Sequence, residues 1–365
     1  MSARPRPAAP RRPAGGLAAL ALAGLLAAAC APLEEEPAPA GAPPEVEPAE
    51  AEEVRMARAD WEAGFLQAAI VAHLLEELGY DVTDPAEATL SPETFYPLLA
   101  RGDYDLWANG WFPLHARFLE RELVTGQRVA TPIEPVGTLV EAGAVQGYLV
   151  DAATAADLDV TSTEDLRRPE VAAAFDTDGD GTADVLGCEE GWGCRRAIDR
   201  QLDELPWGEA VTQVVGDYDD HVAEARERVA AGEPVLLYAW TPSATVDVLR
   251  PGEDVLWLES QALPGAEEPT TVRGLEGCAG DDPCELGWTV NDLRAVARAD
   301  LVEEHPPIRR LLEVVEIPLG DLTAHSAEMA AAEEYSDDDL AMAAAEWVAE
   351  HRSVVDGWLA HARGD

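Results

Sequence analysis

Residues 175–194 read FDTDGDGTADVLGCEEGWGC, and this stretch combines three features. An acidic segment with glycines is followed by a pair of cysteines, and a tryptophan lies between two glycines inside that pair. Gly191 and Gly193 flank Trp192, so its ring is presented and the neighbouring backbone N–H groups stay accessible. The loop opens a predicted helix, and helix starts in α/β folds face the ligand cleft. We therefore expect Trp192 to contact a ligand.

The acidic segment has the oxygen ligands that a calcium ion prefers. Carboxylates recur on alternate residues at Asp176, Asp178 and Asp180, and Asp184 follows four residues later. The position at which an EF-hand loop carries its last glutamate is Gly187, so the loop is not a complete EF-hand. An acidic turn braced by hydrogen bonds of its aspartates explains the same pattern. A calcium site and an acidic turn therefore both stay open.

Four cysteines form two pairs of equal spacing. Five residues separate Cys188 from Cys194, and five separate Cys278 from Cys284. Structural zinc sites use closely paired cysteines or a nearby histidine, which these spacings lack. In an exported protein, such pairs predict two local disulfides.

The N-terminal residues indicate export. Arginines without acidic neighbours precede an apolar run over residues 17–29, which is typical of a signal peptide and short for a membrane span. Cys30 follows small residues, as in a bacterial lipobox, so we expect residues 1–30 to be a lipoprotein signal peptide and Cys30 to be lipidated. Ordinary cleavage beside Cys30 is the alternative. Residues 31–53 are rich in Glu and Pro and predict an extended tether. The expected location is extracytoplasmic, anchored by lipid to the bacterial cell membrane, on its outer face or in the periplasm.

The composition excludes several classes of partner. The chain has 365 residues and a net charge of −46 at pH 7, and all of its 25 basic residues are arginine. Nucleic acid and anionic membrane surfaces bind basic faces, so we expect neither, and contact with a membrane only through the lipid anchor. Hydrophobic residues make up 47% of the chain, which is enough for a core. The acidity fits a solvated surface in salty surroundings.

Short apolar runs alternate with amphipathic helices after the tether, as is typical of an α/β fold. The expected strands are residues 54–57, 105–108, 146–150, 211–215, 235–240 and 293–296. The expected helices are residues 61–78, a helix starting at Ser91 and Pro92, residues 219–231 and residues 336–361. The length suits two lobes with a ligand cleft between them.

Three of the ten tryptophans have positions that indicate a ligand site. Trp111 follows a predicted strand, Trp192 precedes a predicted helix and Trp240 ends another predicted strand. The other seven are assigned to core packing: Trp61, Trp107, Trp207, Trp257, Trp288, Trp347 and Trp358.

The sequence contains no motif of a known catalytic site. A Gly-rich phosphate loop, a nucleophile elbow and an HExxH motif are all missing, and the histidines are scattered. We therefore predict no catalytic residue and do not expect an enzyme.

These features together resemble the periplasmic glycine betaine/proline betaine-binding proteins of ABC importers, of the ProX type. The resemblance is carried by residues 102–115, 146–151, 175–194 and 234–242, and it extends more weakly over most of residues 54–365. It implies a two-lobed, class II periplasmic-binding-protein fold with a ligand cleft between the lobes. Lobe I would comprise residues 54–152 and 291–365, and lobe II residues 153–290.

The resemblance also implies the ligand contacts. The family holds a quaternary ammonium group in a box of three tryptophans, which fall at Trp111, Trp192 and Trp240. It holds the ligand carboxylate with a histidine and two backbone N–H groups, which fall at His115, Gly193 and Cys194. A quaternary ammonium group donates no hydrogen bond, so aromatic faces are its natural partners, and a helix N-terminus suits an anion.

The implied function is capture of a betaine-type osmolyte for an ABC permease by a monomer. No cofactor is expected apart from calcium at the Asp-rich loop. Ser243 and Ala244 depart from the family pattern, because a further aromatic residue is expected near them. Two alternatives stay open: a binding protein for another quaternary amine, such as choline or carnitine, and a cell-surface module ordered by calcium.

Overall fold

The computed structural model describes residues 53–266, 270–332 and 334–364. The predicted signal peptide, Cys30 and all but the last residue of the predicted tether lie outside the described residues. Among the described helices, none combines the length and the apolar character needed to cross a lipid bilayer.

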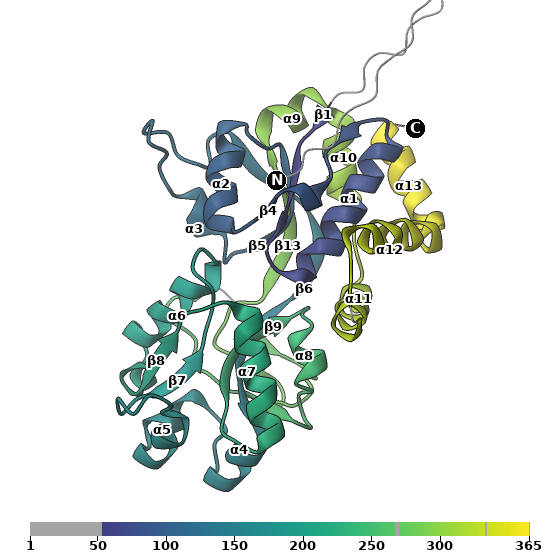
Figure 1. The fold of residues 1–365 in the computed structure, drawn as a ribbon. Helices are drawn as coiled ribbons and strands as arrows, with labels where there is room; N and C mark the ends of the chain where they lie inside the picture. Colours follow the sequence, from purple (N-terminus) through teal and green to yellow (C-terminus); the bar gives the residue numbers. More distant parts are fainter. Residues whose placement is uncertain (1–52, 267–269, 333, 365) are drawn as a thin grey trace, which may run out of the picture. The chain divides into compact units, whose positions relative to one another are not determined.

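Nine strands within the described residues form one mixed sheet (Figure 1). Their order is β4-β2-β5-β13-β6-β9-β7-β8, and β10 pairs with β6. Nearly every residue of β5, β7 and β9 is buried, and most of these residues are apolar, as is typical of strands with both faces covered. The strands are β2 (Met56–Ala59), β4 (Thr89–Leu90), β5 (Leu106–Phe112), β6 (Ile133–Asp151), β7 (Ala183–Leu186), β8 (Val211–Val214), β9 (Leu236–Thr241), β10 (Val255–Leu258) and β13 (Asn291–Arg298). Two short pairs lie apart from this sheet: β1 (Glu53–Val54) with β3 (Asp81–Val82), and β11 (Thr271–Val272) with β12 (Cys284–Glu285).

Strand β6 connects two parts of this sheet. Up to Ala144 it pairs with β13, which pairs in turn with β5, and from Val145 onward it pairs with β9. We call the strands on the β13 side the first part of the sheet and those on the β9 side the second part. Shortly before β6 changes its pairing strand, Ala142 has a φ of 46°, and its N–H donates to the Asp292 carboxylate at 2.8 Å. Such an irregularity bends a strand, so β6 bends between the two parts.

The helices cover the sheet and place the C-terminus against the N-terminal helix. Helix α1 packs against α12, and α10 packs against both α13 and β6 (Figure 1). The helices are α1 (Phe65–Glu77), α2 (Pro92–Arg101), α3 (Ala116–Leu119), α4 (Ala152–Leu158), α5 (Pro169–Phe175), α6 (Gly193–Glu204), α7 (Tyr218–Ala231), α8 (Thr245–Val248), α9 (Ala299–Glu304), α10 (Pro306–Val314), α11 (Leu319–Ala331), α12 (Asp337–Glu350) and α13 (Arg352–Arg363).

Most predicted elements are present, but the C-terminal helix was predicted incorrectly. Helix α2 begins after Ser91 as expected, and α7 ends at Gly232 in the left-handed conformation. The single helix predicted over residues 336–361 is instead two helices that meet at His351. The His351 imidazole stacks on the indole of Trp347 with ring centroids 4.2 Å apart, and the break brings Trp358 within 6.4 Å of the same indole. The predicted lobe boundaries stay a prediction.

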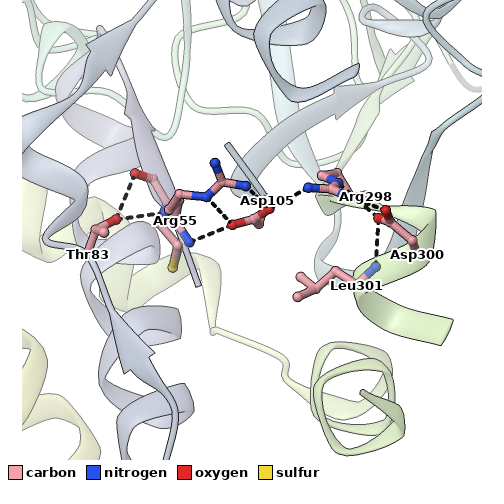
Figure 2. A network of polar contacts seen from close by, with 7 residues as sticks. Arg55, Thr83, Asp105, Arg298, Asp300 and Leu301 are labelled. Carbon is pink, nitrogen blue, oxygen red and sulfur yellow. Dashed lines mark hydrogen bonds and ion pairs between the residues drawn. The ribbon is translucent and has the colours of Figure 1, made fainter. Parts of the chain in front are cut away.

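A buried carboxylate holds three segments of the first part of the sheet together (Figure 2). Asp105, directly before β5, is 5% exposed and accepts hydrogen bonds from the Nε and Nη2 atoms of Arg55, each at 2.8 Å. It also accepts a bond from Nη1 of Arg298 at 3.1 Å, and Arg298 is paired with Asp300. A buried charge is tolerated when charge-assisted hydrogen bonds surround it in this way. The network ties the start of β2, the start of β5 and the end of β13 to one another.

Replacement of Asp105 by asparagine should lower the free energy of unfolding by about 2–3 kcal/mol, because two partly buried arginines lose their shared charged partner. Urea unfolding measures the change. The matched control is Asp103→Asn, since Asp103 forms a half-exposed ion pair with Arg101 whose loss costs under about 1 kcal/mol. Equal losses in the two variants would contradict the role given to Asp105.

Candidate ligand-binding site

One pocket brings together all six residues that the sequence predicted for ligand binding. Its lining consists of Trp111, His115, Trp192, Gly193, Cys194 and Trp240, with Trp61, Leu114, Gln146 and Tyr238 in addition. The four tryptophans are between 3% and 7% exposed, so their rings are nearly withdrawn from bulk water. The pocket therefore offers mainly aromatic and aliphatic surface, with a few polar groups.

The three predicted tryptophans lie where strands end and a helix begins. Trp111 is close to the end of β5, Trp240 is close to the end of β9, and Trp192 immediately precedes α6. The rings of Trp192 and Trp240 stand edge to face, with centroids 5.5 Å apart and an angle of 82° between the planes. This is a favoured aromatic geometry, and it sets two walls of the pocket at nearly a right angle.

Both predicted disulfides are present. The bridge between Cys188 and Cys194 closes the loop that carries Trp192. The same loop is held from outside, because the carbonyl of Gly191 accepts a hydrogen bond from the N–H of Glu93 at 3.2 Å. A loop that is fixed in this way loses less conformational freedom when a ligand binds.

His115 is a neutral imidazole with a defined tautomer. Burial, with a smaller contribution from the nearby Arg117 charge, lowers its pKa to about 3. The backbone N–H of Trp111 donates to its Nδ1 atom at 3.2 Å, and the Tyr96 hydroxyl lies 3.1 Å from the same atom. Since Nδ1 accepts a hydrogen bond, the single proton of the ring is on Nε2. His115 is therefore an uncharged N–H donor at neutral pH.

The first turn of α6 adds two more N–H donors. The helix begins at Gly193, and the first N–H groups of a helix have no acceptor within it. A Cβ atom at Gly193 would lie 2.9 Å from Cγ of Leu114 and 3.3 Å from Cδ2 of His115, so only glycine permits this approach. Nη1 of Arg117 donates to the Gly193 carbonyl at 3.2 Å and fixes the contact. Together with His115, this helix end could bind an anionic group.

Several carboxylates in the segments around the pocket have raised pKa values. Burial raises the pKa of Asp60 to about 6, and the negative charge of Glu189 raises it further. Burial is also the main reason for the raised pKa values of Glu62, Glu189 and Asp219. Oε1 of Glu62 accepts a hydrogen bond from the N–H of Ala244 at 2.8 Å, which links the segment after β2 to the segment after β9.

The Asp-rich loop contributes no residue to the pocket lining. Carboxylate oxygens of Asp176, Asp178 and Asp184 lie within 4.8 Å of one another, whereas Asp180 is not part of this group. The Asp176 carboxylate accepts backbone hydrogen bonds from Gly179 at 2.7 Å and from Gly181 at 3.0 Å. Hydrogen bonds from the backbone to an aspartate are typical of an acidic turn. Carboxylate oxygens grouped this closely are also the ligands that a calcium ion needs. The geometry is thus compatible with both interpretations of the loop.

Trp61 was assigned to the core, but it lines the pocket. It lies two residues after β2, and β2 runs parallel to β5, whose end carries Trp111. Neighbouring parallel strands end at the same edge of a sheet, so the argument that identified Trp111 applies equally to Trp61. Leu114, Gln146 and Tyr238 were also missed, because their residue types are common in protein cores.

Comparisons with known proteins identify relatives over most of the chain. The family model of the substrate binding domain of the ABC-type glycine betaine transport system matches residues 52–350. The glycine betaine-binding periplasmic protein OusX of Dickeya dadantii is 34% identical over 299 residues, 81% of this chain and 86% of that protein. The glycine betaine/proline betaine-binding periplasmic protein of Salmonella typhimurium is 33% identical over 298 residues, 81% of this chain and 86% of that protein.

The solved structures confirm the predicted two-lobed α/β fold. An ABC-transporter choline binding protein in complex with choline superposes with a TM-score of 0.63 at 19% identity, over 86% of this chain and 93% of that chain. The named relatives are periplasmic, which agrees with a protein that works outside the cytoplasm. Since the family model covers most of its length, the chain belongs to the family of substrate-binding domains of ABC-type glycine betaine transport systems, which are transport receptors and not enzymes.

Proposed function

We propose that this chain captures a glycine betaine-type zwitterion outside the cytoplasm and delivers it to an ABC permease. The observation that carries the proposal is the pocket itself, in which tryptophan rings lie beside an uncharged imidazole donor and a helix N-terminus. A small molecule with a quaternary ammonium group at one end and a carboxylate at the other matches both features. The matched family and the names of the relatives support the same class of ligand.

The quaternary ammonium group binds against the rings of Trp111, Trp192 and Trp240. It has no N–H to donate, so hydrogen-bond acceptors offer it little, whereas each indole face attracts it by roughly 0.5–2 kcal/mol. Near-complete burial of the rings supports the upper part of this range, because little water competes. The right-angle arrangement of Trp192 and Trp240 supports contact with two different methyl groups.

The carboxylate of the ligand binds at the start of α6. Its oxygens accept hydrogen bonds from the backbone N–H groups of Gly193 and Cys194 and from Nε2 of His115. These donors are uncharged, and the helix dipole adds a partial positive charge at the same place. An anion is thus held without a cationic side chain, which suits a ligand that has no net charge.

Capture and delivery require no bond to be made or broken, so the protein has no catalytic residue. It acts as a monomer, held at the membrane by a lipidated Cys30 and by the tether of residues 31–53. The lobes, with the boundaries that the family resemblance implies, close over the ligand by bending at β6. The hydrogen bonds between Glu62 and Ala244 and between Arg117 and Gly193 support this closure, because each joins segments that carry different walls of the pocket.

The Asp-rich loop has two candidate roles. Backbone hydrogen bonds to the Asp176 carboxylate support a structural acidic turn. The grouping of Asp176, Asp178 and Asp184 supports calcium as the second candidate. A calcium-bound loop would order the domain, and it need not affect the pocket.

Glycine betaine should raise the melting temperature of the purified protein, because a ligand at 100 times its Kd stabilises the folded state by about 2.7 kcal/mol. A thermal-shift screen with betaines, choline, carnitine, glycine and calcium chloride tests this.

In calorimetric titration, Trp192→Ala should lower the affinity for glycine betaine at least about tenfold. Unchanged binding in that variant would refute the site, and a response to calcium alone would favour the calcium-ordered surface module.

The contribution of His115 should depend on the ligand. His115→Phe removes the Nε2 donor, so glycine betaine affinity should fall by about tenfold or more, while choline, which has no carboxylate, should lose much less. Titration of one variant with both ligands provides an internal control for misfolding. Equal losses for glycine betaine and choline would count against a carboxylate at His115.

The free energy of unfolding should decrease as the pH rises from about 4 to 7. Asp60 binds its proton more tightly in the folded protein, where its pKa is about 6, than in the unfolded chain, where it is near 4. The bound proton therefore stabilises the folded state at low pH, and this stabilisation is lost as the pH rises past 6. The contribution of Asp60 is about 2 kcal/mol after allowance for solvent screening. Urea unfolding at several pH values should show a weaker dependence in Asp60→Asn. A pH dependence as strong in Asp60→Asn as in the unmodified protein would contradict this role of Asp60.

A further inference from the structure

The indole N–H groups of two pocket tryptophans converge on one buried oxygen atom. Oδ1 of Asn109 accepts hydrogen bonds from Nε1 of Trp61 at 3.0 Å and from Nε1 of Trp111 at 2.9 Å. Asn109 is 2% exposed, and its Nδ2 donates to Oε1 of Gln67 at 2.8 Å. Gln67 is fully buried and donates to the carbonyl of Ala63 at 3.3 Å. Because two donors meet Oδ1 and an acceptor meets Nδ2, every bond agrees with one orientation of the amide group.

The ring of Trp61 faces the pocket and contacts residues on both sides of it. Its centroid is 5.5 Å from that of Trp192 at an interplanar angle of 69°, and 6.3 Å from that of His115 at 74°. Trp192 thus stands edge to face with Trp61 as well as with Trp240. Three tryptophan rings therefore follow one another around the pocket, and the fourth, Trp111, is linked to Trp61 through Asn109.

The segment that carries Trp61 is tied to the segment after β9. Oε1 of Glu62, the neighbour of Trp61, accepts the hydrogen bond from the Ala244 N–H at 2.8 Å. The wall formed by Trp61 is therefore connected to the segment that follows Trp240.

We propose that Trp61 is a fourth aromatic wall of the ligand site and that Asn109 is a positioning residue for both Trp61 and Trp111. This inference rests on the proposed function. An indole that is anchored at Nε1 cannot rotate freely, so the two rings keep their orientation while the pocket is empty. A shared acceptor also couples them, since a shift of one ring changes the bond available to the other. The walls on the β2–β5 side of the pocket are thus set before the quaternary ammonium group arrives, which reduces the entropy lost on binding.

The first test compares two tryptophans that have the same burial. Trp347 is 7% exposed, as Trp61 is, and its Nε1 donates to a side-chain oxygen of Asp321 at 2.8 Å, but it is not part of the pocket lining. Trp61→Leu should lower the affinity for glycine betaine about tenfold in calorimetric titration, and Trp61→Phe, which retains a ring, should lower it less. Trp347→Leu should lower the melting temperature similarly and leave the Kd unchanged. An unchanged Kd in Trp61→Leu, or an equal change in Trp347→Leu, would overturn the assignment.

The second test addresses Asn109. Asn109→Leu removes the shared acceptor and should weaken glycine betaine binding about as much as Trp61→Leu, while Asn109→Asp keeps the acceptor for both indoles, although it loses the bond to Gln67, and should bind more tightly than Asn109→Leu. The double variant of Trp61→Leu and Asn109→Leu should lose less affinity than the product of the single losses, because both act on one wall. In NMR spectra, Asn109→Leu should shift the indole N–H signals of Trp61 and Trp111 but not that of Trp347. A loss of stability without a loss of affinity in Asn109→Leu would overturn the positioning role.

The unmodified protein separates failure of this inference from failure of the proposed function. If it binds no quaternary amine in the screen, the proposed function fails and this inference fails with it. If it binds glycine betaine and Trp192→Ala abolishes binding while Trp61→Leu and Asn109→Leu do not, only this inference is overturned.

Discussion

The pairing of β6 with two different neighbours is the constraint on which the pocket depends. In the first part of the sheet, Leu293 of β13 is opposite both Trp111 of β5 and Val140 of β6. In the second part, Trp240 of β9 is opposite Gln146 of β6. Two walls of the pocket are therefore connected through β6, in which five residues lie between Val140 and Gln146. A shift of one residue in either pairing would turn a tryptophan to the opposite face of the sheet, so the register of β6 is part of the site.

The bend in β6 lies between Val140 and Gln146. Ala142 is in the left-handed region, and its N–H is held by Asp292, a residue of β13. A regular strand would carry the second part of the sheet onward in one direction. A bent strand changes the angle between the two parts while their hydrogen bonds persist, which is what closure over a ligand requires. The same element thus fixes the register of the walls and permits them to move.

A short segment around β5 sets three further properties of the site. Asn109 holds two indole rings, Trp111 provides one of them, and the backbone N–H of Trp111 fixes the tautomer of His115. The Asn109 amide and the Trp111 indole N–H are both hydrogen-bonded, so neither of these buried groups carries the cost of an unpaired group in a dry environment. Asn109 accepts both indole hydrogen bonds, although it is not part of the pocket lining.

Local signals in the sequence predicted the α/β class, both disulfides and the three tryptophans Trp111, Trp192 and Trp240. Trp192 lies between two glycines in a cysteine loop, and Trp111 and Trp240 are next to apolar runs that indicate buried strands. The two-lobed fold and the roles of His115, Gly193 and Cys194 came from the family resemblance. Trp61 was missed because the helix predicted over residues 61–78 begins with it, whereas α1 begins at Phe65 and Trp61 lies just after the end of β2. Long-range hydrogen bonds such as that of Trp61 with Asn109 leave no periodic pattern. The break between the last two helices at His351 was also missed. His351 stacks on Trp347 at the break, and helix propensity does not reveal such a contact between side chains.

The strong negative charge of the chain acquires a more specific meaning beside this pocket. A zwitterion has no net charge, so the charge of −46 neither attracts nor repels it from a distance. At close range the two ends of such a ligand experience different fields. In the proposed binding mode, the carboxylates of Asp60 and Glu189 near Trp192 would favour the ammonium end, while the N-terminus of α6 would favour the carboxylate end. Such a local field would orient a ligand on which the net charge has no effect, and the acidic surface would not oppose capture.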